Sequence, residues 1–207
     1  MGRRKAVASI AAVLCLCVLG SCATTKLTGS WADPTYSSSH FKKVMIVGVA
    51  RRELMRKIFE NTFSDRLREH GVEGIPSGTF APGTDLLDRE ALAAKLTELG
   101  CDGVLVTRLI DRTTQTTVYP STGYAVPIAY HGGYYAYYRG AYAIAYRPGY
   151  AVESTTASLE TNLYDARTGK LAWTGLTETV VSGDPASQAE ELIGILIGSL
   201  TEAKLIR

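Results

Sequence analysis

Lys43-Val-Met-Ile-Val-Gly-Val49 is a nearly continuous run of apolar residues, and it decides what kind of fold the chain can adopt. Such a run is typical of a strand that is covered on both faces, as in the parallel sheets of α/β proteins. An amphipathic segment over 53–70 follows it and predicts a helix that ends at Gly71, where a left-handed cap is common. The sequence therefore starts its domain with a buried strand and a covering helix.

Three further elements extend this pattern after Gly71. Residues 72–75 predict a short strand, and Asp88 is a suitable N-cap for a second helix that ends at Gly100. The apolar stretch Gly103-Val-Leu-Val-Thr-Arg-Leu-Ile110 predicts the next strand. Because crossovers between parallel strands are right-handed, we expect these three strands to lie side by side in the order 2-1-3.

The pattern changes in the second half of the chain. Residues 112–119 alternate like a half-exposed strand, and 153–164 and 171–181 predict two long strands. The loop Asp165-Ala-Arg-Thr-Gly169 joins the last two as a hairpin, and Asp184-Pro185 opens a final helix. The predicted fold class is α/β, with a βαβαβ start, antiparallel strands and a C-terminal helix, in a mixed-sheet sandwich of two or three layers.

Residues 1–21 have the build of a secretory signal peptide, with a basic start and a 15-residue run without charge. This run is too short to span a membrane comfortably. Its end, Leu19-Gly20-Ser21-Cys22, is similar to the lipobox of bacterial lipoproteins. The resemblance implies cleavage before Cys22 and attachment of a lipid to its thiol, and several acyl chains give lasting anchorage. The alternative is an ordinary signal peptide with a chance cysteine.

The residue after Cys22 is Ala23, not the Asp that retains lipoproteins in the inner membrane of enterobacteria-like species. The resemblance therefore implies an outer-membrane location with the domain facing the periplasm, and exposure at the cell surface stays open. Residues 22–40 are rich in Thr, Ser and Gly, so we expect a lipidated tether that lifts the domain from the bilayer. Alternatively, Trp31 and Tyr36 dock this segment on the domain as a first short strand.

The charge balance argues against a nucleic-acid partner. The chain has 22 Lys and Arg against 20 Asp and Glu, but Arg3, Arg4 and Lys5 belong to the signal peptide. The rest of the chain has 19 basic and 20 acidic residues, so it has no excess of positive charge with which to bind DNA or RNA. After cleavage and lipidation Cys101 is the one cysteine left with a free thiol, and its apolar neighbours in sequence predict that it is buried.

The segment 119–150 stands out by composition, because it holds ten of the 12 tyrosines, several Gly and Pro, and no carboxylate. We expect it to project from a single α/β domain over 41–207, as an insertion between two neighbouring strands. Tyrosine combines an apolar face with a polar tip, which suits a binding surface. The candidate binding surface consists of Tyr134, Tyr135, Tyr137 and Tyr138. The alternatives are a low-complexity insertion without a binding role, and a membrane hairpin, because residues 141–146 alternate like a strand.

Motifs that look like catalytic or cofactor sites have structural explanations. Arg167-Thr-Gly-Lys170 is predicted to be a hairpin turn, because it lacks the first glycine and the magnesium-binding hydroxyl of a phosphate loop. Gly194-Ile-Leu-Ile-Gly198 lies in a short apolar run, and we expect close packing of helix on sheet to explain its glycines. Asp111 and Arg112 follow a strand, where functional residues often lie in α/β folds, and are candidates for function. We therefore expect no enzyme, no catalytic residue, no cofactor and no metal site.

Several segments together resemble small envelope lipoproteins of Gram-negative bacteria. They are the lipobox, KVMIVGV at 43–49, REHGVEGIPS at 68–77, GVLVTRLI at 103–110 and SLETNLYDARTGKLAWTG at 158–175. The βαβαβ start followed by antiparallel strands also resembles the periplasmic α/β domains of the curli-secretion lipoprotein and the TolB N-terminal domain. These relatives imply envelope assembly, export or scaffolding, and no specific binding residue of theirs is matched here.

Three classes of function compete on this basis. We expect a lipid-anchored module that acts in binding, scaffolding or assembly without catalysis, with an envelope protein or peptidoglycan as its partner. The second class is a component of an oligomeric export pore that uses 119–150 as a membrane hairpin. The third is an unrecognised envelope enzyme, which would depend on single residues such as Cys101 and Asp111.

Overall fold

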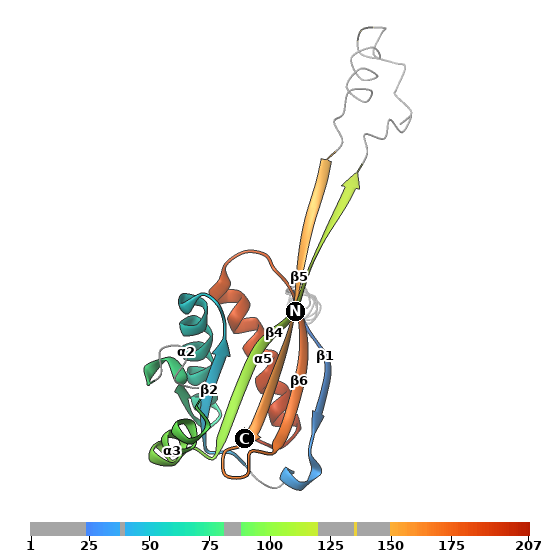
Figure 1. The fold of residues 1–207 in the computed structure, drawn as a ribbon. Coiled ribbons are helices and arrows are strands. Elements are labelled where there is room, and N and C mark those ends of the chain that lie inside the picture. Colours follow the sequence, from blue (N-terminus) through green and yellow to red (C-terminus); the bar gives the residue numbers. More distant parts are fainter. Residues whose placement is uncertain (1–23, 38–39, 81–87, 120–134, 136–149) are drawn as a thin grey trace, which may run out of the picture.

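The computed structural model describes residues 24–37, 40–80, 88–119, 135 and 150–207. It shows an α/β body from which two strands project as a long ribbon (Figure 1). The strands are β1 (Thr25–Ala32), β2 (Lys43–Val49), β3 (Glu73–Pro76), β4 (Gly103–Tyr119), β5 (Tyr150–Asp165) and β6 (Leu171–Val180). The helices are α2 (Glu53–Glu69), α3 (Arg89–Leu99) and α5 (Pro185–Glu202), and two short 3-10 turns are η1 (Pro34–Tyr36) and η2 (Ser77–Thr79).

One six-stranded mixed sheet forms the centre of the body, with the strand order β1-β6-β5-β4-β2-β3. β2 pairs in parallel with both β3 and β4, which is the predicted 2-1-3 order of the βαβαβ half. The remaining pairs, β4 with β5, β5 with β6 and β6 with β1, are antiparallel. The predicted α/β class, with a mixed sheet and a C-terminal helix, is confirmed.

Each face of the sheet has its own apolar cluster, because successive residues of a strand point to opposite faces. Val44, Ile46 and Leu105 pack on the face covered by α2 and α5, where Trp173 is only 1% exposed. Met45 packs on the other face, together with α3 and residues of β3 and β4. Since α3 covers only this part of the second face, the body has three layers over β2 to β4 and two layers over β5, β6 and β1.

The helix ends follow the signals in the sequence. Gly71 and Gly100 have positive φ angles of 72° and 67° just after α2 and α3, a backbone conformation that glycine adopts without steric cost. Asp88 and Asp184 cap α3 and α5, because the side chain of each accepts a hydrogen bond from the backbone N–H three residues further on. These caps explain why both helices begin where the sequence predicts.

Two expectations need correction. The tether predicted for 22–40 is not free along its length, because Thr25–Ala32 forms β1 and pairs with β6 at the edge of the sheet. This agrees with the alternative of a first docked strand. Residues 112–119 are not a separate strand but the second half of β4, which continues past a register shift between Leu109 and Asp111. A β-bulge adds a residue without ending the strand. The change from apolar to polar residues near Asp111 therefore reflects the passage of β4 from the buried to the exposed part of its length.

Candidate functional site

The most distinctive surface of the described chain is the ribbon in which β4 and β5 leave the body. Thr114–Tyr119 pairs here with Tyr150–Thr155, and no other strand of the described residues pairs with either segment. The residues favour extended structure, because Thr, Val and Tyr are common in strands. A two-stranded ribbon is at best marginally stable in water, so it depends on the continuation of both strands into the sheet.

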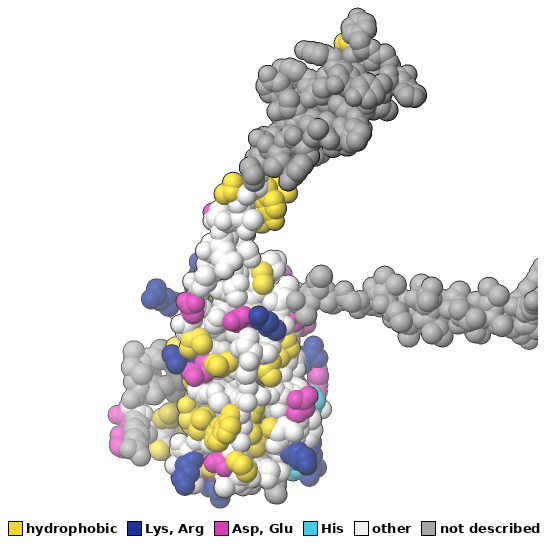
Figure 2. Space-filling view, turned by 90° about the vertical axis from the view of Figure 1, so that its right-hand side faces the viewer, with side chains coloured by type: hydrophobic (Ala, Val, Ile, Leu, Met, Phe, Trp, Pro, Cys, Tyr) yellow, Lys and Arg dark blue, Asp and Glu magenta, His cyan; other side chains and the backbone are white. Residues whose placement is uncertain are grey.

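The end of the ribbon is apolar, whereas its shaft is polar. Four side chains, which we call the apolar tip, are between 46% and 67% exposed: Val118, Tyr119, Tyr150 and Val152. The rings of Tyr119 and Tyr150 stack across the two strands, with centroids 4.9 Å apart. Figure 2 shows hydrophobic side chains gathered at the far end of the ribbon, beyond a shaft of mostly uncharged polar residues. Exposed tyrosines at the end of a projection suit contact with a partner.

Neither face of the shaft is apolar. Directly opposite residues of paired strands share a face, and successive residues alternate between the two faces. One face carries Gln115 opposite Ser154, and the other carries Thr116 opposite Glu153. A membrane-spanning strand needs one face that is apolar throughout. The described part of the ribbon therefore does not favour the export-pore alternative.

The structure places one of the predicted site residues. Tyr135 is 64% exposed, whereas Tyr134, Tyr137, Tyr138 and the predicted lipid-attachment residue Cys22 lie outside the described residues. The tyrosine surface and the anchor therefore stay predictions. The structure shows what carries the segment 119–150: the paired strands β4 and β5 form a ladder that ends at Tyr119 and Tyr150. The sequence analysis missed the two valines of the tip, which the strand-like alternation next to Tyr119 and Tyr150 could have indicated.

The start of β1 is fixed to α5. Glu191 accepts hydrogen bonds from Thr24 Oγ1 at 2.6 Å and from the backbone N–H of Thr25 at 2.9 Å. These bonds, the one from the Thr24 hydroxyl foremost, lower the pKa of Glu191 because they stabilise its charged form. The Thr24 carbonyl also accepts a hydrogen bond from Val180 N–H at 2.8 Å. The chain is therefore held in place from Thr24 onward, two positions after Cys22.

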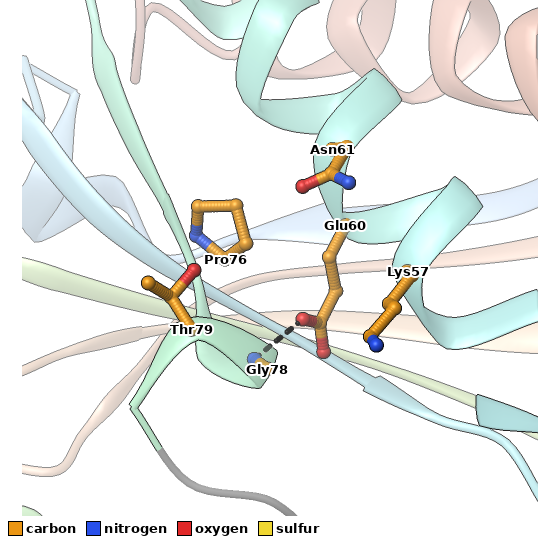
Figure 3. Close-up of a pocket in the computed structure, with 6 residues that line it drawn as sticks. All are labelled: Lys57, Glu60, Asn61, Pro76, Gly78 and Thr79. Carbon is orange, nitrogen blue, oxygen red and sulfur yellow. Dashed lines mark hydrogen bonds between the residues drawn. The ribbon is translucent and has the colours of Figure 1, made fainter. Parts of the chain in front are cut away.

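A polar pocket of about 110 Å³ lies between α2 and the turn after β3 (Figure 3). Glu60 is fully buried beside it, and Oε1 accepts hydrogen bonds from Gly48 N–H at 2.9 Å and Ser77 Oγ at 2.6 Å. Oε2 accepts a third from Gly78 N–H at 2.8 Å. A carboxylate has about four lone-pair sites, so three donors leave little capacity for a ligand. Glu60 therefore ties α2 to β2 and η2. The sequence signal that we missed is its position three residues before the core residue Phe63, on the buried stripe of the helix.

The single residues that an enzyme would use do not form a site together. Cys101 is 7% exposed, and burial raises the pKa of its thiol, which disfavours the reactive thiolate. Asp111 and Arg112 are exposed on β4. Asp111 lies about 26 Å along this strand from Gly103, where β4 begins close to Cys101. Asp111 accepts a hydrogen bond from the hydroxyl of Thr113 at 2.9 Å. Within the described residues, no three His, Cys, Asp or Glu side chains form a group that could hold a metal ion.

The turn between β5 and β6 confirms the hairpin interpretation of Arg167 to Lys170. Asp165 Oδ1 accepts hydrogen bonds from the backbone N–H groups of Arg167 at 2.8 Å and Thr168 at 2.9 Å. Burial acts to raise the pKa of Asp165, but the hydrogen bonds from Thr168 and Arg167 outweigh it and hold the pKa below its ordinary value. The carboxylate therefore closes the turn in its charged form.

The glycine pair of α5 contradicts the predicted close packing. A Cβ atom built at Gly194 or Gly198 would meet nothing within 4 Å, and both residues are exposed. They line an open groove of about 430 Å³ beside α2, opposite Arg66 and His70. The helix packs on the sheet through its other side, which includes Leu196. Of the helices in the described ranges, none is long and apolar enough to cross a membrane.

No family model and no curated protein matches the chain. Among solved structures, it is similar to the PelC dodecamer from Paraburkholderia phytofirmans, with 12% identity over 89% of this chain and 98% of that chain, and a TM-score of 0.45. It is also similar to the lipoprotein GNA1162 from Neisseria meningitidis, with 13% identity, 78% and 99% coverage and a TM-score of 0.41. A PDZ domain protein from Parabacteroides distasonis has 9% identity, 93% and 39% coverage and a TM-score of 0.43. Similarities this distant carry no argument about function.

Proposed function

We propose that this chain is a lipid-anchored protein of the bacterial cell envelope that acts by binding, scaffolding or assembly and not by catalysis. A lipid on Cys22 holds the α/β body at a membrane, and the ribbon presents the segment 119–150 to another envelope component. The observation that carries this proposal is the ribbon itself, which exposes an apolar tip at the end of two long paired strands. The burial of the Cys101 thiol supports a role without a nucleophile.

The anchor part of the proposal depends on the signal peptide and on its lipobox-like end at Cys22. Because Ala23 is not the inner-membrane retention residue, we propose an outer-membrane location with the body on the periplasmic side. Cys22→Ser should leave an unprocessed precursor without acyl label, whereas the matched variant Cys101→Ser should be processed and acylated like the original chain. Normal maturation and membrane retention of Cys22→Ser would contradict the anchor. In a host that uses the Asp signal, Ala23→Asp should move the protein to the inner membrane.

The contact part is tested by removing the segment that the ribbon carries. Deletion of residues 122–149 should leave a body with an unchanged melting temperature, because the body has its own core. The same deletion should abolish the crosslinks that the protein forms to other envelope components in intact cells. If every crosslinked component is retained after the deletion, the ribbon is not the contact surface.

The role of the tyrosines is tested by a matched pair of variants. Replacement of Tyr134, Tyr135, Tyr137 and Tyr138 by Ser should weaken the crosslinks, whereas replacement of the same four residues by Phe should preserve most of them, because the rings remain. The melting temperature should be the same in both variants. A much earlier melting of the Ser variant would show that these rings belong to a core.

A further inference from the structure

The start of β1 and the base of the ribbon lie at the same end of the body (Figure 1). Thr24 accepts a backbone hydrogen bond from Val180, and Val180 is the partner of Thr156 in the ladder between β6 and β5. The ribbon begins with the next pair of β4 and β5, Thr114 with Thr155. The chain that leads back to Cys22 therefore leaves the body at the level where the ribbon begins.

The distances along the chain decide how far the anchor can be from the ribbon. Two peptide steps separate Thr24 from Cys22, so the backbone of Cys22 lies within about 7 Å of Thr24. The six residue pairs of the ribbon extend about 20 Å beyond this level. Even if the connecting residues run alongside the ribbon, its tip reaches roughly 10 Å further than the residue that bears the lipid.

In the opposite orientation, the ribbon would point away from the membrane. The distance between Thr24 and the bilayer would then be too long for the connection to Cys22 to bridge. This orientation would require the turn between β5 and β6 to rest on the bilayer, at the far end of the body. β6 runs ten residues from that turn to Val180, which is about 33 Å of strand. A connection of two residues cannot cover this distance. With Cys22 anchored as proposed above, the ribbon can only lie along the bilayer surface or point into it.

The chemistry of the ribbon suits a lipid interface. Tyr119 and Tyr150 combine an apolar ring with a hydroxyl, as do the tyrosines enriched at the headgroup level of membrane proteins. Val152 adds exposed apolar surface on the same face as the two rings, and Val118 adds it on the opposite face of the ribbon. Glu153 is the one charged residue among the twelve of the ribbon, and the hydroxyl groups of the shaft can bond to water and headgroups.

From this arrangement we propose that the apolar tip inserts into the headgroup region of the same membrane that anchors Cys22. The inference rests on the lipid attachment proposed above and names the component that the ribbon contacts: the lipid surface itself, in place of peptidoglycan or a protein. The lipid and the tip are then two attachment points on one bilayer. Because the second contact is intramolecular once the first is made, weak insertion of the tip is enough to fix the orientation of the body.

The experiment compares fluorescent labels at the two ends of the acylated, full-length mature protein in phosphatidylethanolamine–phosphatidylcholine vesicles. An environment-sensitive dye is attached to Thr117→Cys next to the tip, or to Thr168→Cys in the far turn, each in a Cys101→Ala background. We expect the emission of the Thr117 label to shift to the blue and to be quenched by nitroxide lipids. The Thr168 label should show neither effect. Adding Tyr119→Ser and Tyr150→Ser should remove the quenching at position 117.

Mass spectrometry of the N-terminal peptide separates the two possible failures. If Cys22 carries its acyl groups but the Thr117 label is not quenched, or is quenched no more than the Thr168 label, the tip does not contact the membrane and this inference is overturned alone. If Cys22 carries no lipid, the anchor of the proposed function is wrong and this inference is overturned with it. Quenching that persists at position 117 after both Tyr→Ser changes would overturn the role of the tip.

Discussion

β4 and β5 pass through two regions of the molecule with opposite surroundings. In the body, Val104, Leu105 and Leu163 of these strands are at most 8% exposed and pack beneath the helices. In the ribbon, the same two strands are covered on neither face by a described element. The difference lies in the residues, because the apolar run at the start of β4 gives way to Thr and Gln. One pair of strands is therefore core at one end and exposed at the other, and packing constrains only the first.

The largest effect that this comparison predicts is at Trp173. Its indole is buried against Gly175, where an added Cβ would lie 2.4 Å from the ring. We expect Trp173→Ala to lower the free energy of unfolding by about 3–5 kcal/mol, measured by denaturant titration. The exposed ring of Tyr150 is the matched control, and Tyr150→Ala should change this free energy by about 0.5 kcal/mol or less. Equal losses in the two variants would contradict the division between body and ribbon.

The next effect is at Glu60, the carboxylate that holds α2 on the end of β2. Glu60→Ala leaves the buried donors of Gly48, Ser77 and Gly78 without their acceptor. We expect a loss of about 1–3 kcal/mol in the free energy of unfolding, because buried unsatisfied groups are costly. Glu69 lies on the same helix in an exposed ion pair, and Glu69→Ala should cost about 0.5 kcal/mol or less. A loss at Glu60 as small as that at Glu69 would mean that its hydrogen bonds are not needed.

A smaller, pH-dependent effect is expected at Asp165. Its pKa in the folded state is below the ordinary value near 3.9, so its charge contributes stability that is fully present above that value. This contribution is lost as the pH falls through the lowered pKa. Asp165→Asn should therefore reduce the free energy of unfolding by about 1 kcal/mol at pH 7, with a difference from the original chain that shrinks below about pH 4. Denaturant titrations at several pH values check this, and a constant difference would contradict it.

The smallest effect on stability belongs to the stacked pair of the ribbon. Tyr119→Ala removes the ring that stacks on Tyr150 and should leave the global free energy of unfolding unchanged within about 0.5 kcal/mol. The ribbon should open more often, because it has few other contacts beyond its own ladder. We therefore expect faster hydrogen exchange at the amides of Thr116 and Thr117, measured by NMR. If the exchange of core amides such as Leu105 speeds up as much, ribbon and body unfold together and the comparison fails.

Local signals in the sequence predicted most of the fold. Asp88, Gly100 and Asp184 act through their own backbone neighbours, so their roles as caps are visible without knowing the fold. The apolar run of β2 and its parallel pairing with β4 were predicted in the same way, because a strand buried on both faces has a recognisable composition.

Features that depend on distant partners were predicted only in part. Trp31 and Tyr36 indicated a docked first strand as an alternative, but Thr25 pairs with Thr179, 154 positions away, so nothing near β1 indicates which strand it pairs with. The donors to Glu60 come from two other elements, and a glutamate in an amphipathic helix is ordinarily taken as exposed. The candidate site was predicted in part: composition indicated the tyrosine segment, but the ribbon that presents it follows from the uninterrupted ladder of β4 and β5.

The pairing of β1 with β6 also has a consequence for the order in which the domain is completed. β1 is synthesised first, yet its partner strand begins only at Leu171, after every other strand has been made. Until β6 has been made, β1 has no strand to pair with, and β5 has an open edge to which other extended chains can bind. Pairings this distant in sequence form slowly, because a long loop must close first. The sheet is therefore complete only when its first strand in the chain pairs with its last.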